Sequence, residues 1–148
     1  MYGDTPLLSA ARHNLPLEVI TALIKAGADV NPGSVDADTP LMWAAGHSNL
    51  EVVTALAQAG ADVNARGSKK ITVLMRAVMP LNPNPEVITR LLEFGAEPKA
   101  RNRWGEMAID IAKKNESLKD TDALRKLEKV SRLNWFELKT RFRQNLRQ

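Results

Sequence analysis

The sequence contains no cysteine, which excludes disulfide bonds, thiolate metal sites and cysteine nucleophiles. Aromatic residues make up only 5% of its 148 residues, so a hydrophobic core must be built from Ala, Leu, Val and Ile. No apolar run approaches the ~18 residues that a membrane-spanning helix needs. The first residues have neither a basic start nor an apolar stretch, so we expect no signal peptide and take the cytoplasm as the default location. The 44% hydrophobic and 26% charged residues are the balance of a globular chain.

Charge is unevenly distributed along the chain. Residues 1–64 carry two basic and seven acidic side chains, a net charge of −5. Residues 65–148 carry 19 basic and 10 acidic side chains, a net charge of +9. Such asymmetry concerns association with partners rather than fold. We therefore expect a partner whose surface is acidic where it meets the basic half of the chain.

An internal repeat organises the sequence. Its four copies begin at Thr5, Thr39, Thr72 and Met107, at intervals of 34, 33 and 35 residues. A second block, Gly-Ala followed by an acidic residue, begins at Gly27, Gly60 and Gly95. Each of these glycines lies 12 residues before the next repeat start, so all the variation in length falls within the turn between the two blocks. Periods of this length are typical of stacked repeat proteins.

The pattern within one unit predicts two helices and a projecting loop. Thr and Pro suit a helix start, because Thr caps backbone amides and Pro at the first position loses no hydrogen bond. Beyond a turn, apolar residues recur at the spacing of one helical face, as in Val52, Val53, Leu56 and Ala57. The repeated glycine suits the left-handed residue that ends a helix. The polar stretch after it is typical of a hairpin-like loop.

The unit from Thr39 to Ala65, TPLMWAAGHSNLEVVTALAQAGADVNA, resembles the ankyrin repeat nearly position for position. The resemblance covers residues 3 to about 130 and implies an all-α solenoid of four helix-turn-helix repeats with projecting hairpin-like loops. We place the repeats at residues 3–35, 36–68, 69–103 and 104–130, in a domain of residues 1–130. Where the family has His after Thr-Pro-Leu, this chain has Leu8, Met42, Met75 and Asp110. The supporting hydrogen bonds that this His makes in the family must therefore be absent here or be made by other groups.

In the ankyrin family the binding surface is usually the concave face, formed by the loop tips and exposed positions of the first helices. The resemblance thus implies a non-catalytic module that binds another protein without a cofactor, and the sequence contains no catalytic motif. His13 and His47 alone do not make a metal site. The candidate partner-binding residues are Trp43, His47, Arg66, Lys69, Arg76, Met79, Arg101, Arg103 and Trp104. The alternative for the two tryptophans is packing within the solenoid, and for the basic residues it is solvated loop charge.

The last residues depart from the repeat. Asn134 and Glu137 have the spacing of a capping box, which predicts an amphipathic basic helix within residues 131–148. Three interpretations stay open: a cap over the fourth repeat, a docking element for another protein or a second copy of the chain, and a basic helix that touches a membrane surface or nucleic acid. The alternative function is accordingly a self-associating homodimer, or a module whose C-terminal helix binds the partner. The interspersed acidic residues and the lack of any base-reading motif argue against nucleic acid.

Overall fold

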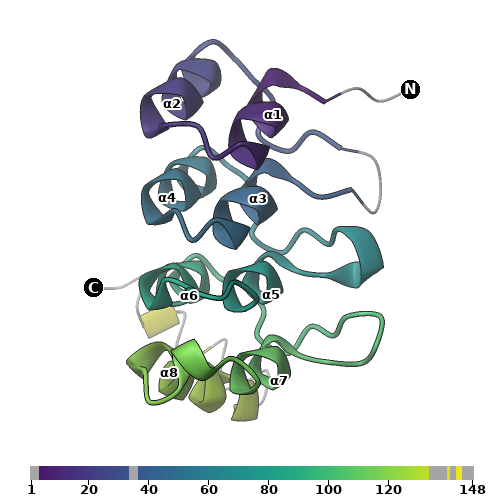
Figure 1. Cartoon of the computed structure of the whole chain (residues 1–148), viewed down its shortest axis with the longest axis vertical. Helices are drawn as coiled ribbons and strands as arrows, with labels where there is room; N and C mark the ends of the chain where they lie inside the picture. Colours follow the sequence, from purple (N-terminus) through teal and green to yellow (C-terminus); the bar gives the residue numbers. More distant parts are fainter. Residues whose placement is uncertain (1–3, 34–36, 134–139, 141–142, 145–148) are drawn as a thin grey trace.

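Eight α-helices and two short 3-10 helices make up the described part of the chain (Figure 1). The computed structural model describes residues 4–33, 37–133, 140 and 143–144. The α-helices are α1 (Pro6–Arg12), α2 (Leu17–Lys25), α3 (Pro40–Gly46), α4 (Leu50–Gln58), α5 (Val73–Val78), α6 (Pro85–Glu93), α7 (Ala108–Lys113) and α8 (Asp122–Arg132). The 3-10 helices are η1 (Ser68–Lys70) and η2 (Glu116–Leu118).

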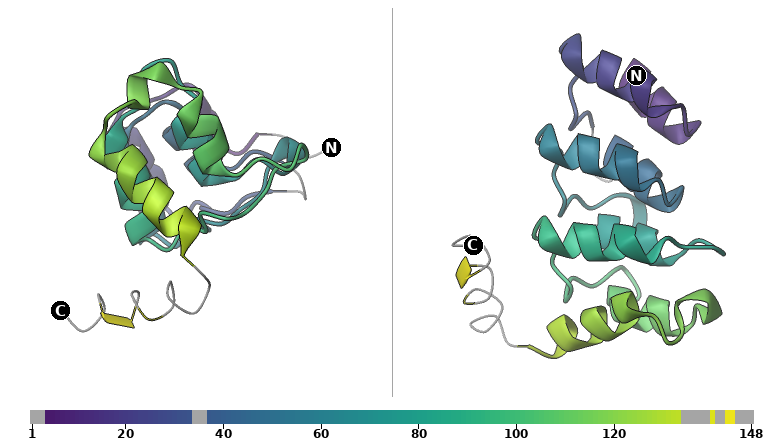
Figure 2. Two further views of the ribbon diagram at one scale, coloured as in Figure 1. Left: turned by 90° about the horizontal axis from the view of Figure 1, so that it is seen from below. Right: turned by 90° about the vertical axis from the view of Figure 1, so that its left-hand side faces the viewer.

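The α-helices form four antiparallel pairs stacked along one axis (Figure 2). The odd-numbered helices make one layer and the even-numbered helices the other, and each helix contacts its pair partner and the equivalent helix of the next pair. The loops that join successive pairs project together from one side of the stack. Within the described residues the only β structure is one isolated bridge, between Arg66 and Thr72. The expected all-α solenoid with projecting loops is confirmed.

A threonine at the start of each of the first three repeats caps an odd-numbered helix. The hydroxyl oxygens of Thr5, Thr39 and Thr72 accept the amide N–H of the residue three positions later, at 3.1, 3.3 and 3.2 Å. Each bond satisfies an amide that would otherwise lack a partner within the helix. The glycines after the even-numbered helices all have positive φ, at 90° for Gly27, 98° for Gly60 and 94° for Gly95. Both helix boundaries predicted from the repeat are therefore confirmed.

Two side chains that stand at the family's His position provide a hydrogen bond of their own. The amide N–H of Thr72 lies 3.5 Å from Sδ of Met75, and the amide N–H of Met107 donates to Oδ2 of Asp110 at 2.8 Å. The carboxylate of Asp110 therefore binds the start of α7, which has lost the threonine cap of the other repeats. An acidic side chain in the first helical turn also interacts favourably with the helix dipole.

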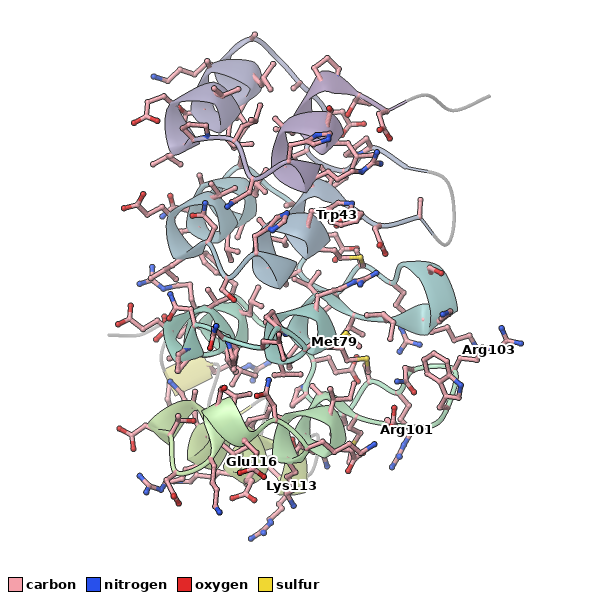
Figure 3. All side chains as sticks on the ribbon, in the orientation of Figure 1. Trp43, Met79, Arg101, Arg103, Lys113 and Glu116 are labelled. Carbon is pink, nitrogen blue, oxygen red and sulfur yellow. The ribbon has the colours of Figure 1, made fainter. Side chains whose placement is uncertain are left out.

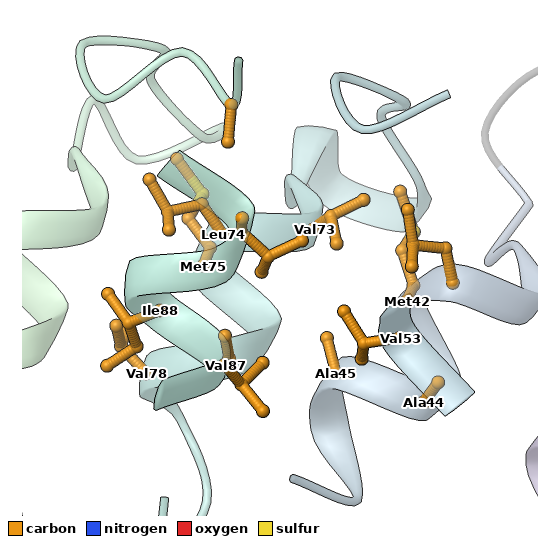
Figure 4. Packing of buried hydrophobic residues seen from close by; sticks show 14 of the residues in the cluster. Met42, Ala44, Ala45, Val53, Val73, Leu74, Met75, Val78, Val87 and Ile88 are labelled. Atoms are coloured by element: carbon orange, nitrogen blue, oxygen red, sulfur yellow. The ribbon is translucent and has the colours of Figure 1, made fainter. Parts of the chain in front are cut away.

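Small side chains allow close packing between repeats. The alanine pair of α3, Ala44 and Ala45, is 2% and 0% exposed. Figure 4 shows Ala45 and its neighbour Val53 opposite Val73 and Val87 of the next repeat. Because no repeat buries its apolar surface alone, stability comes mainly from these contacts between neighbours.

Asparagine side chains bind each repeat to the next at the base of the projecting loops. The amide nitrogen Nδ2 of Asn31 donates to the carbonyl of Gly60 at 2.9 Å, and its Oδ1 accepts the amide N–H of Asp62 at 2.7 Å. Asn64 makes the two equivalent bonds to the third repeat, at 3.1 and 2.8 Å. We call these four bonds the asparagine ladder.

The helix expected within residues 131–148 lies outside the described residues beyond Leu133, apart from Thr140, Arg143 and Gln144, which are helical. Helix α8 itself continues to Arg132. Across the described part of the chain, no helix combines the length and the apolar character needed to cross a membrane.

Candidate functional site

The candidate residues lie along the odd-numbered helices and their projecting loops. Trp43 lies on α3, Met79 directly follows α5, and Arg101 and Arg103 lie in the loop between α6 and α7 (Figure 3). Residues that are far apart in the sequence therefore share one side of the stack. The contacts within this surface differ between its two ends.

The loop before α5 presents basic side chains from a closed turn. The amide N–H of Gly67 donates to the carbonyl of Ile71 at 2.9 Å, which holds the two sides of the loop together. At the tip, Lys69 has a φ of 59°, in the left-handed region. The side chains of Arg66 and Lys69 are exposed.

The loop before α7 is held by Asn102, which carries no signal in the repeat pattern. This residue is 5% exposed, and its Oδ1 accepts the amide N–H groups of Trp104 and Glu106 at 2.9 and 3.0 Å. Its Nδ2 donates to a carboxylate oxygen of Glu106 at 3.1 Å. Asn commonly organises turns by such side-chain-to-backbone bonds. The loop conformation leaves the side chain of Trp104 exposed, with 61% of the residue accessible to solvent.

The two loops contact each other and gather their basic residues around Trp104. The ammonium of Lys69 lies 5.6 Å from the centroid of the Trp104 ring, within the range of a cation–π interaction. The amide N–H of Arg103 donates to the carbonyl of Lys69 at 2.9 Å, and a guanidinium N–H of Arg101 donates to the carbonyl of Gly105 at 2.6 Å. Within the described residues, no ion pair involves the basic side chains at these tips, which belong to Arg66, Lys69, Arg101 and Arg103.

At the other end of the surface, Trp43 is held between Arg12 and His47. The Arg12 guanidinium carbon lies 5.5 Å from the Trp43 ring centroid, and the His47 ring stacks on Trp43 at 6.4 Å and 28°. Nε2 of His47 donates to the carbonyl of Arg12 at 2.7 Å, and the Arg12 guanidinium pairs with Asp4. Trp43 is half-buried and packs against the core. Its indole N–H is buried without a hydrogen-bond partner in the described structure.

Arg76 is bound by the chain itself. Its Nη2 donates to Oδ2 of Asp38 at 2.5 Å, and about a third or less of either side chain is exposed (30% and 18%). This ion pair joins the first projecting loop to α5, across 38 residues of sequence. The backbone at Gly67 approaches Asp38 so closely that a Cβ atom there would collide with the carboxylate.

A groove of about 520 Å3 lies between the third and fourth repeats. Its apolar lining includes Met79, Leu81, Trp104 and Ile111. Met79 is 42% exposed and Leu81 is 89% exposed. Leu81 was not indicated by the repeat pattern, because it lies in the turn where the third repeat has two extra residues. We call this feature the repeat 3–4 groove.

An ion pair borders the groove. The ammonium of Lys114 lies 2.6 Å from a carboxylate oxygen of Glu106. The hydrogen bonds from Lys114 and Asn102 lower the pKa of Glu106 below its usual value. The hydrogen bond to Glu106 and the attraction of its charge raise the pKa of Lys114. At neutral pH the charges of this pair offset each other, and the exposed carboxylate of Glu116 adds one negative charge to the lining of the groove.

Comparison with protein families matches residues 2–67 to a family model described as ankyrin repeats, in three copies. No curated protein matches the sequence. The third and fourth helix pairs lie outside the matched range but continue the same stack.

Proposed function

Since residues 2–67 match a model of ankyrin repeats, which are generally protein–protein interaction modules, we propose that this chain binds a partner protein through its concave face and loop tips without catalysing a reaction. The observation that carries the proposal is the exposed Trp104, surrounded by basic side chains that form no ion pair with any residue the structure describes. Tryptophan and arginine are enriched among the residues that contribute most to binding energy at interfaces.

The loops around Trp104 are held by hydrogen bonds before any partner arrives. The Oδ1 atom of Asn102 fixes the tip of the third loop, and the carbonyl of Lys69 holds it against the second loop. A surface that is already ordered loses little conformational freedom on binding. A few exposed side chains on this surface can therefore support a specific complex.

The charges of the tips favour an acidic partner. Arg66, Lys69, Arg101 and Arg103 are exposed, and the carboxylate of Glu106, in the loop of Arg101 and Arg103, is paired with Lys114. Complementary charge raises the association rate and suppresses unsuitable partners. Because these side chains are exposed, the attraction should weaken as salt is added.

The remaining candidates extend the proposed surface along the stack. Met79 exposes an adaptable apolar side chain beside the groove. Trp43, His47 and Arg76 already make contacts within the chain. They would therefore contribute a rigid part of the binding surface, with side chains that are already held in place. We therefore place the centre of recognition at the third and fourth repeats.

The proposal is tested by affinity capture from a lysate of the source organism, with quantitative mass spectrometry of the proteins retained. One bait is the unaltered chain, and a second carries Arg101→Glu and Arg103→Glu. The matched control carries Lys25→Glu and Lys119→Glu, the same charge change at exposed positions away from the projecting loops.

We expect specific proteins to be retained by the unaltered chain and the control, and lost with the loop variant. Their capture should also decrease at higher salt. Equal retention by all three baits would contradict the proposal. Sedimentation of the unaltered chain at rising concentration is the control for self-association, because a dimer formed through the tips would be disrupted by the same charge reversal.

A further inference from the structure

The repeat 3–4 groove lies at a position in the repeat whose equivalent, in the second repeat, is filled by a large side chain. Trp43 is the fourth residue after the start of the second repeat, Thr39, and Ile111 is the fourth residue after the start of the fourth, Met107. The side chain of Trp43 fills its position, where it packs against the core between Arg12 and His47. Ile111 is half-buried at the lining of an open groove.

The residues around these two positions correspond as well. Arg12, over the ring of Trp43, is the seventh residue after the start of the preceding repeat, and Met79 has that place beside Ile111. His47 on the other side of the ring corresponds to Asn115, which also lines the groove. At both positions the side chain of this residue donates hydrogen bonds to backbone carbonyls of the preceding repeat. His47 donates to the carbonyl of Arg12, and Asn115 donates to the carbonyls of Val78 and Pro80 on either side of Met79.

The side chains at the two equivalent positions differ in size and chemistry. Isoleucine is much smaller than tryptophan, and the thioether of Met79 replaces a guanidinium that covers the ring in the first two repeats. Methionine is flexible and polarizable, so it adapts to the shape of an apolar guest. Figure 3 shows Met79 on the same side of the stack as Trp43.

We propose that the repeat 3–4 groove binds a bulky apolar side chain, aromatic by preference, of an acidic segment in the partner protein, in the space that corresponds to the ring of Trp43. This inference rests on the proposed function and specifies the partner. Its volume of about 520 Å3 is within the ~300–1,000 Å3 of typical ligand clefts. Leu81, which is 89% exposed, would become buried against the guest.

The repeat 3–4 groove is continuous with the basic loop tips, and this determines which charge we expect on the bound segment. Trp104 lines the groove and also lies under the ammonium of Lys69, so apolar and basic surfaces meet at this one residue. Arg101 and Arg103 extend from the same loop (Figure 3). A segment that places its apolar side chain in the groove would therefore bring its neighbouring residues close to the exposed basic side chains of Lys69, Arg101 and Arg103. Carboxylates are the side chains that fit there.

The test uses a random-peptide library displayed on phage and selected against the immobilised full chain. We expect enriched peptides to combine acidic residues with at least one Trp, Phe, Leu or Met. The most enriched peptide is then synthesised with a fluorophore, and its dissociation constant is measured by anisotropy for the unaltered chain and for four variants.

Two variants change the groove and one is their control. Ile111→Trp fills the groove with a ring of the chain's own, as in the second repeat, and Leu81→Ser removes an exposed apolar contact. The control is Leu15→Ser, an exposed leucine in the equivalent turn of the first repeat. We expect at least about tenfold weaker binding for Ile111→Trp, a smaller loss for Leu81→Ser and no change for Leu15→Ser. Because Leu81 is almost fully exposed, its variant provides the test if Ile111→Trp does not fold.

The fourth variant, Arg101→Glu with Arg103→Glu, separates the two proposals. If it loses acidic peptides while Ile111→Trp and Leu81→Ser bind them as the unaltered chain does, the groove proposal is wrong and the proposed function stands. If no acidic peptide is enriched, both are contradicted. If the unaltered chain sediments as a dimer that Ile111→Trp converts to a monomer, the guest is a second copy and the proposal of an acidic partner segment is overturned.

Discussion

Removing the side chain of Asn64 should weaken the stack between the second and third repeats. Its Nδ2 donates to the carbonyl of Gly95 at 3.1 Å, and its Oδ1 accepts the amide N–H of Glu97 at 2.8 Å. The substitution Asn64→Ala deletes both bonds and leaves the helices and their apolar contacts in place. The amide N–H of residue 64 keeps its own bond to Asp62, at 2.9 Å.

The magnitude follows from the number of bonds and their exposure. A typical hydrogen bond within a protein contributes about 0.5–1.5 kcal/mol net, so two bonds contribute about 1–3 kcal/mol. Asn64 is exposed, and water can take over part of what is lost. We therefore expect a decrease of about 1–2 kcal/mol in the free energy of unfolding, which for a chain of this size lowers the melting temperature by roughly 2–8 °C.

Urea unfolding followed by far-ultraviolet circular dichroism measures this change. The matched control is Asn82→Ala, because the structure uses only the backbone carbonyl of Asn82, which accepts a hydrogen bond from Ser48. A destabilisation of Asn64→Ala no greater than that of Asn82→Ala would refute the reasoning. Weaker coupling should also broaden the transition, since stability in repeat proteins is a sum of repeat and neighbour contributions.

Two further predictions concern single contacts. Gly67→Ala should destabilise the fold by about 1–3 kcal/mol in urea unfolding, because the added methyl group collides with the carboxylate of Asp38. Gly33→Ala is its control, since a methyl group there meets no atom within 4 Å, and equal effects would contradict the explanation. Lys114→Met should be less stable than the unaltered chain near neutral pH. The lowered pKa of Glu106 means that this difference is lost as the pH falls through the folded-state pKa, and a pH-independent difference would contradict it.

The repeat register, the helix caps and the loop positions could be predicted from the sequence because they depend on local contacts. Thr39 caps an amide three residues away, and Gly60 ends a helix through its own backbone. Both signals recur at fixed intervals, so each copy supports the interpretation of the others. The stacking follows, because a helix pair with one apolar face has only its neighbours to bury it against.

The groove and the fate of individual candidates could not be predicted in this way. Ile111 and Trp43 occupy equivalent positions in the repeat but pack against different neighbours. The repeat pattern does not show these neighbours, so it does not predict the groove. Arg76 was a candidate for binding, but its guanidinium is paired with Asp38, 38 residues earlier. The buried Asn102 lies at a position where the repeat pattern shows only a polar loop.

The asparagine ladder has a mechanical consequence. Its bonds join only adjacent repeats, and the helix layers likewise make their main contacts with immediate neighbours. A pulling force on the two ends would therefore load the interfaces in series, and the weakest would part first. Each unravelled repeat of 33 to 35 residues would lengthen the chain by about 110 Å, at ~3.4 Å per residue less the thickness of the folded unit. Under tension the chain would extend in steps of one repeat, and the ladder would resist separation at the first two of its three interfaces.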